Sequence, residues 1–109
     1  MTSKIQTLIV VIGMVALQWG SGAFAQDHGE AGKKLFNHTA VPACAVCHTL
    51  KDAGAAGETG PSLDELKPDA SRVEKAVRNG IGQMPAFSSL SDEQIKTLSK
   101  YVAEVAGTR

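Results

Sequence analysis

The sequence is poor in aromatic residues and in cysteine. Its 109 residues include only three phenylalanines, one tyrosine, one tryptophan and two cysteines. A chain of this length forms one small domain, and so few large rings cannot fill a conventional hydrophobic core. Two cysteines also cannot provide a network of disulfides. We therefore expect another large apolar group to complete the core.

An excess of charge of one sign is also absent, because eleven basic residues balance eleven acidic ones. A protein that binds nucleic acid or an anionic membrane surface needs a strong positive field, so neither partner is predicted. No segment alternates apolar and polar residues over the length of a strand, which argues against a sheet. The sequence predicts an all-α fold of several short helices joined by long loops.

The first 25 residues differ in composition from the rest. A basic start at Lys4 is followed by a mostly apolar stretch and by the small-x-small cleavage pattern Ala23-Phe24-Ala25. This pattern predicts a signal peptide over residues 1–25, cleaved after Ala25, and an exported, periplasmic domain over residues 26–109. The alternative is an uncleaved membrane anchor, because no charged residue lies between Lys4 and Asp27. If the signal is cleaved, we expect no stable membrane insertion.

The first helix of the mature domain is predicted over residues 27–37. After it, the Gly/Ala-rich stretch over residues 51–60 has no apolar periodicity and is predicted to be a loop. A single helical turn is expected over residues 62–66, and Pro68 would end it. On the first helix, the spacing places Ala31, Leu35 and Phe36 on the inner side and Lys33 and Lys34 in water.

Two capping boxes predict the last two helices. Ser71 with Glu74 would begin the first of them, which would end near Asn79-Gly80, and Ser91 with Gln94 would begin the second. The last helix carries an apolar stripe of Ile95, Leu98, Val102 and Val105, with Tyr101 beside it.

The most informative motif is Cys44-Ala45-Val46-Cys47-His48. Two thiols at this spacing can add to the two vinyl groups of one haem, and the following histidine can supply an imidazole to the iron. A disulfide would close only a tiny loop, and a thioredoxin-like pair would need a βαβ pattern, which the sequence does not show. A zinc site would need further ligands, which only His28 and His38 could supply. Covalent haem attachment accounts best for the spacing and for the incomplete core.

Met84 is the candidate for the second axial ligand of the iron. It is the only methionine in residues 26–109 and lies in Gly80-Ile81-Gly82-Gln83-Met84-Pro85. The glycines let the backbone pass close to the haem, and the proline biases Met84 towards an extended conformation. Met84 could instead fill the core, which is the usual fate of a methionine. His28 and His38 are alternative ligands, and both are predicted to face solvent instead.

The order of these patterns resembles the class I cytochrome c family over nearly all of the mature domain. The resemblance implies the cytochrome c fold, one covalently attached haem c, and His48 and Met84 as the iron ligands. It also implies that the Pro61 carbonyl accepts a hydrogen bond from His48, and that Gly32 lets the first and last helices cross closely against Tyr101. The matching patterns are Gly32 with Leu35 and Phe36, the cysteine-histidine motif, Gly60-Pro61-Ser62-Leu63, Met84, and Leu98-Tyr101-Val102.

With both axial positions filled, the iron has no open position for a substrate. We therefore expect an electron carrier and not an enzyme. The alternative is a haem-based sensor or peroxidase-like enzyme in which the Met84 ligand is displaced. The expected contact surface is the haem edge, ringed by the small residues Ala45, Val46, Ala55, Ala56, Pro85 and Ala86.

The expected partners are a redox protein that donates the electron and another that accepts it. Residues 47–61 resemble small cytochromes that accept electrons from bacterial sulfite dehydrogenases, which implies such an enzyme as the donor. A terminal oxidase or another cytochrome would be the acceptor. The sequence leaves open whether the protein is a free carrier or a bound subunit of a larger oxidoreductase.

Overall fold

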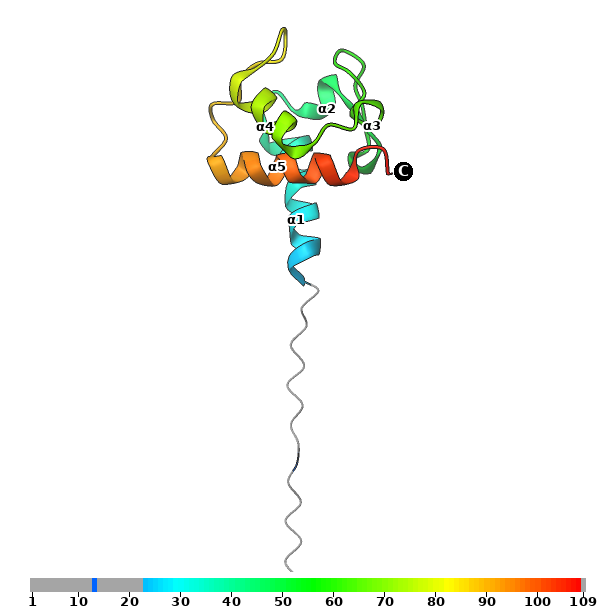
Figure 1. Cartoon of the computed structure of the whole chain (residues 1–109), viewed down its shortest axis with the longest axis vertical. Coiled ribbons are helices and arrows are strands. Elements are labelled where there is room, and N and C mark those ends of the chain that lie inside the picture. Colours follow the sequence, from blue (N-terminus) through cyan, green and yellow to red (C-terminus); the bar gives the residue numbers. More distant parts are fainter. Residues whose placement is uncertain (1–12, 14–22, 109) are drawn as a thin grey trace, which may run out of the picture.

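The computed structural model of the chain describes Gly13 and residues 23–108, so most of the predicted signal peptide lies outside the described residues. The longest helices are α1 (Ala23–Lys34), α4 (Ala70–Asn79) and α5 (Asp92–Val105). The one-turn helices α2 (Cys44–Cys47) and α3 (Leu63–Leu66) lie between α1 and α4 in the chain. Figure 1 shows α1 projecting from one end of the domain and α5 running across the inner end of α1. The predicted all-α fold is confirmed, and no helix of the described part is both long and apolar enough to cross a membrane.

Helix α1 continues directly into a π-helical turn, η1 (Leu35–Thr39), so helical structure covers the whole predicted range. Leu35 and Phe36 are buried, as expected. Ala31 is exposed, and its predicted inward position is wrong because the buried stripe is centred on Gly32 and Phe36. Lys33 is only half-exposed and does not simply face water, because its Nζ lies 3.9 Å from an Asp52 carboxylate oxygen.

The predicted loop over residues 51–60 contains regular structure that the sequence pattern did not reveal. Strands β1 (Thr49–Leu50) and β2 (Ala55–Ala56) pair antiparallel around a 3₁₀ turn, η2 (Lys51–Ala53), and Gly54 closes the turn with φ +65°. Each strand has two residues, which is too short to show an alternating pattern. The inward pair, Leu50 opposite Ala55, is buried and joins the hairpin to the core.

The start of α4 corrects the prediction of a cap at Ser71. The helix begins at Ala70, and Asp69 is its N-cap, with one carboxylate oxygen accepting from the Arg72 N–H at 2.8 Å. Asp caps a helix as well as Ser does, and Asp69 stands earlier in the chain, directly after the buried Pro68. The predicted end of the helix at Gly80 is confirmed, where φ is +71°.

The predicted capping box of α5 is present in full. The Gln94 N–H donates to Ser91 Oγ at 3.1 Å, and the Ser91 N–H donates to Gln94 Oε1 at 2.9 Å. The helix then buries Ile95, Leu98 and Val102 together with Tyr101, and leaves Val105 half-buried.

The closest approach of α1 to α5 occurs where Gly32 meets Tyr101. A Cβ atom built on Gly32 would lie 2.5 Å from Tyr101 Cγ and closer still to Tyr101 Cβ. No side chain fits there without moving one helix, so the crossing expected from the resemblance is confirmed. Tyr101 Oη then donates a hydrogen bond of 2.7 Å to Asp52, which joins α5 to the turn of the hairpin.

Candidate functional site

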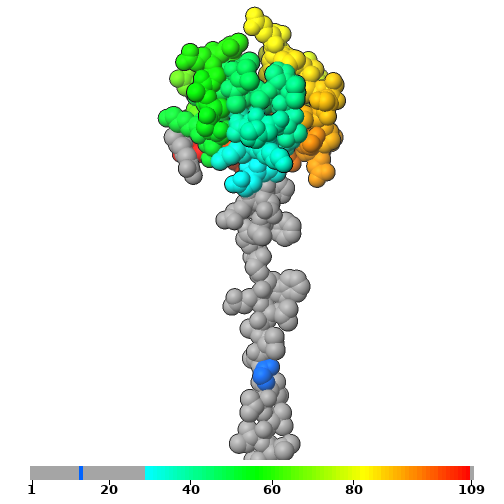
Figure 2. Space-filling model, turned by 180° about the vertical axis from the view of Figure 1, so that it is seen from behind, coloured from blue at the N-terminus to red at the C-terminus, as the bar shows by residue number. Residues whose placement is uncertain are grey.

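Helix α2 places the two cysteines on the same side of the chain. Cys44 and Cys47 are its first and last residues, and the His48 N–H donates to the Cys44 carbonyl at 3.0 Å. Residues three positions apart on a helix are neighbours on one face. Both thiols are half-buried and free of any disulfide, so one ligand can reach both. Figure 2 shows the segment around residues 40–50 on the surface of the face seen from behind.

The environment of Cys44 argues against a thioredoxin-like pair. Burial raises the pKa of the Cys44 thiol to about 11, with the nearby Cys47 adding to the shift, while a backbone hydrogen bond lowers it in part. A redox-active cysteine instead needs a lowered pKa, because the thiolate is the attacking species. Among the residues that the structure describes, no three His, Cys, Asp or Glu side chains are grouped to hold a metal ion. The redox and zinc interpretations of the motif therefore gain no support.

The ring of His48 is held by the loop that contains Pro61. His48 Nδ1–H donates to the Pro61 carbonyl at 2.8 Å, the hydrogen bond that the resemblance implies. Because a carbonyl can only accept, the proton is on Nδ1 and the lone pair of Nε2 is left for a metal. A Cβ atom on Gly60 would lie 2.7 Å from His48 Cε1, so the backbone packs directly against the imidazole.

Gly57 is a second close approach to the same motif, and sequence reasoning missed it. A Cβ atom at Gly57 would lie 2.6 Å from the carbonyl carbon of Cys47 and 2.7 Å from the nitrogen of His48. Thr49 Oγ1 donates to the Gly57 carbonyl at 2.9 Å, and the Gly60 N–H donates to the Cys47 carbonyl at 2.6 Å. The spacing of two glycines before a proline was the available signal, but only a tertiary structure shows what the loop covers.

Met84 comes from the connection between α4 and α5, where a tight turn holds its backbone. The Ile81 N–H donates to the Met84 carbonyl at 3.0 Å, and the Met84 N–H donates to the Ile81 carbonyl at 2.9 Å. A Cβ atom on Gly80 would lie 2.8 Å from the Met84 carbonyl oxygen. The side chain of Met84 is half-buried against the core. Figure 1 shows this connection at the end of the domain opposite to the projecting part of α1.

The connection that carries Met84 is also anchored at its base. The Phe87 N–H donates to the Val77 carbonyl at 2.8 Å, and the Phe87 side chain is only 5% exposed. Arg78, just before the connection, pairs with Asp92, just after it, and with Glu74 at 3.0 Å. The thioether of Met84 is therefore presented by a segment fixed at both ends.

The residues expected to ring the haem edge are mostly at the surface. Ala55 is the exception, because it is buried in the hairpin opposite Leu50, and it does not belong to the rim. His38 is exposed, as predicted, and the side chain of His28 lies outside the described part. The other rim residues are Val46, Ala56, Pro85 and Ala86, which are exposed, and Ala45, which is half-buried.

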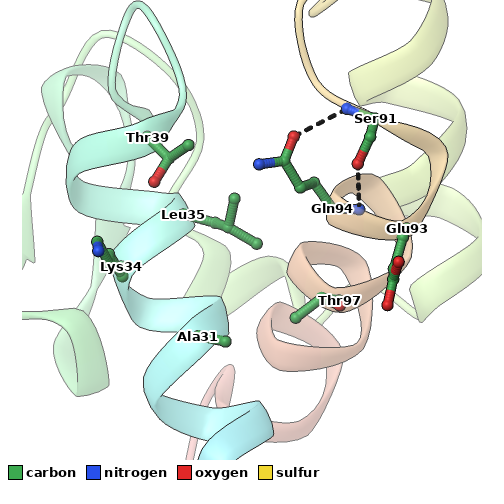
Figure 3. Close-up of a pocket in the computed structure, with 8 residues that line it drawn as sticks. All are labelled: Ala31, Lys34, Leu35, Thr39, Ser91, Glu93, Gln94 and Thr97. Carbon is green, nitrogen blue, oxygen red and sulfur yellow. Dashed lines mark hydrogen bonds between the residues drawn. The ribbon is translucent and has the colours of Figure 1, made fainter.

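A cavity of about 340 Å³ lies elsewhere, between α1 with η1 and the start of α5 (Figure 3). Ser91 and Gln94 line it, but Ser91 Oγ and Gln94 Oε1 already accept the two backbone hydrogen bonds of the capping box. None of the predicted haem-site residues lines this cavity, so it is separate from the candidate site. Its lining consists of Ala31, Lys34, Leu35, Thr39, Ser91, Glu93, Gln94 and Thr97.

The donor set of the candidate site fits a covalently bound haem. Two thiols lie on one side of a helical turn, an imidazole has its Nε2 available, and a soft thioether comes from a separate fixed segment. Imidazole and thioether are the axial ligands of cytochromes c. The Pro61 hydrogen bond is the kind of outer contact that orients a ligating histidine.

Comparisons with known proteins point the same way. Residues 27–102 match the model of the family described as cytochrome C oxidase, cbb3-type, subunit III. Cytochrome c6 of Gloeothece citriformis is 32% identical over 111 residues, which cover 97% of this chain and 96% of that protein. The crystal structure of the c-type cytochrome SorU from Sinorhizobium meliloti is similar with a TM-score of 0.73 and 55% identity, over 75% of this chain and 94% of that chain.

These similarities, together with the donor set, establish the cofactor and the general role. The protein carries a covalently bound c-type haem with iron and is an electron carrier. The chain belongs to the class I c-type cytochromes, in the family described as cytochrome C oxidase, cbb3-type, subunit III.

Proposed function

We propose that the protein shuttles single electrons through one haem that is attached at Cys44 and Cys47 and held by His48 and Met84. The observation that carries this proposal is the anchored turn of Met84, which bonds to Ile81 through both backbone groups. A thioether presented in this way would occupy the sixth position of the iron. With no position left for a substrate, the protein would exchange electrons and carry out no bond chemistry.

The bound haem supplies a one-electron redox centre, and the protein tunes it. The His48–Pro61 hydrogen bond keeps the imidazole in one orientation and increases its basicity. The thioether of Met84 favours the reduced state, so we expect a higher reduction potential than two histidines would give. Gln83 and Pro85, the chain neighbours of Met84, cannot act as general acid or base at neutral pH, which supports a carrier over a peroxidase-like enzyme.

Visible spectra of the purified protein in both oxidation states test this proposal. The wild type should be low-spin and show the methionine–iron charge-transfer band. Met84→Ala should lose that band, whereas His38→Ala, which changes an exposed histidine, should keep it. A wild-type spectrum with high-spin, open iron would contradict the carrier function and favour the sensor or peroxidase-like alternative.

We also propose that the protein is exported and that its signal peptide is cleaved after Ala25. The composition of residues 1–25 supports this proposal. In the structure, α1 begins at Ala23, close to the proposed cleavage position. The intact mass of the native protein measures both modifications, because it should correspond to residues 26–109 plus one haem. A mass that retains residues 1–25 would indicate a membrane anchor instead.

For the partners, we propose a sulfite dehydrogenase as electron donor and a terminal oxidase as acceptor. The sequence resemblance over residues 47–61 supports the donor, and the matching family description, which names a subunit of a cbb3-type oxidase, supports the acceptor. Stopped-flow mixing of the oxidised protein with the sulfite dehydrogenase of the same organism and sulfite should give rapid reduction. Reduction no faster than with sulfite alone would contradict this choice of donor.

A further inference from the structure

Asp64 joins three separate parts of the chain through its carboxylate. It lies in the first turn of α3, and its Oδ2 accepts from the Lys51 N–H at 2.8 Å. Its Oδ1 accepts from the Gly107 N–H, also at 2.8 Å. Gly107 follows α5 and is 43 residues away in the sequence. Because each carboxylate oxygen has its own backbone donor, this residue works as a clamp between α3, the hairpin and the end of α5.

The clamp connects the same two segments as the hydrogen bond of the haem-binding histidine. His48 bonds to Pro61, and Lys51 bonds to Asp64, so each bond spans 13 residues and measures 2.8 Å. The two hydrogen bonds therefore join segment 48–51 to segment 61–64 at two points. A backbone bond from the Gly60 N–H to the Cys47 carbonyl, at 2.6 Å, joins the residues just before the two segments, on the opposite side of Pro61 from Asp64. The hydrogen bond between the Lys51 N–H and Asp64 limits how far the Pro61 carbonyl can move from the His48 imidazole.

Few other polar contacts hold α3 in place. The N-cap bond from the Glu65 N–H to Ser62 Oγ is long, at 3.4 Å, and lies within the turn itself. Leu63 is buried and contributes apolar packing, which does not set the direction of a carbonyl group. Charged acceptors make the stronger hydrogen bonds, so the carboxylate is the best candidate for fixing the loop after Pro61, while the Gly60–Cys47 bond holds it before Pro61.

We propose that Asp64 is a positioning residue for the axial histidine. It acts through the backbone and keeps the Pro61 carbonyl in line with His48 Nδ1–H, which in turn sets the basicity of the iron ligand. This inference rests on the proposed function, in which His48 binds the iron. Asp64→Asn is the informative change, because an amide oxygen can accept from one donor while its NH₂ group faces the other.

The test compares Asp64→Asn with Glu65→Gln in the haem-loaded, reduced protein. Glu65 is exposed and adjacent, so Glu65→Gln removes the same charge without touching the clamp. NMR measures how fast the Nδ1 proton of His48 exchanges with solvent. Loss of one hydrogen bond should speed this exchange roughly fivefold to tenfold in Asp64→Asn and leave it unchanged in Glu65→Gln. The reduction potential should rise more in Asp64→Asn than in the control, because a less basic imidazole stabilises the oxidised iron less.

Equal exchange rates and equal potentials in the two variants would overturn the proposal. If Asp64→Asn does not fold, exchange in the wild type decides the matter. The Lys51 amide should then be at least as protected as the Nδ1 proton of His48, and a Lys51 amide that exchanges freely beside a protected Nδ1 proton would refute the clamp. A wild-type spectrum without an imidazole-ligated haem would instead contradict the proposed function, which keeps the two failures distinct.

Discussion

The crossing of α1 and α5 should tolerate no side chain at position 32. In Gly32→Ala the new methyl group would lie 2.5 Å from Tyr101 Cγ, whereas ordinary contacts begin near 3.4 Å, so the helices must separate by about 1 Å. Overpacking of this kind costs about 3 kcal/mol, and the better helix propensity of alanine offsets about 1 kcal/mol. The net loss of about 2 kcal/mol should lower the thermal midpoint by roughly 8–16 °C for a domain of this size.

Circular dichroism of the haem-loaded protein during heating measures this effect. Gly29→Ala is the matched control, because it lies in the same helix with no atom within 4 Å of the added carbon. Helix propensity alone, at about 1 kcal/mol, should then raise the midpoint by about 4–8 °C. If Gly32→Ala were as stable as Gly29→Ala, the close packing of the two helices would not be what requires the glycine.

Three further predictions concern polar groups. Ser99 is 1% exposed and its hydroxyl has no hydrogen-bond partner in the described structure. Ser99→Ala should therefore leave the free energy of unfolding in urea unchanged or raise it by up to about 1 kcal/mol. A loss of more than about 1 kcal/mol would contradict this prediction. Tyr101→Phe removes the bond to Asp52 and should cost about 1–2 kcal/mol in the same assay, and no loss would show that burial of the ring alone matters. The pKa of Asp64 is lowered from 3.8, first by the Gly107 N–H, and that of Asp92 first by Arg78. Both carboxylates therefore stabilise the fold above pH 3.8, and this contribution is lost as the pH falls below that value. The thermal midpoint should drop with it, and less so in Asp64→Asn.

Most of the candidate site could be recognised from local sequence. Cys44, Cys47 and His48 form one short motif, and Met84 stands between glycines and a proline that shape its turn. The short range of these patterns is the reason, because the chemistry of a covalent attachment depends on residue types at fixed spacing. Their roles as haem attachment points and iron ligands remain predictions for the spectroscopic test.

Local patterns failed where two options were equally good or where contacts came from distant residues. Ser71 and Asp69 are both good caps, and the structure uses Asp69, which stands earlier in the chain. Ala31 and Gly32 both follow the helical spacing, but the position of Tyr101 decided which of them faces inward.

The sequence by itself determined the all-α fold, the covalent haem motif and the order of the helices. These features arise from residue type, capping and spacing over a few positions. Only the tertiary structure decided how the His48 ring is held, through Gly57, Gly60 and Pro61, and which carboxylate secures that loop. The bond from Gly107 to Asp64 spans 43 residues, and no local propensity encodes a contact of that range, because packing of the whole chain brings the two groups together.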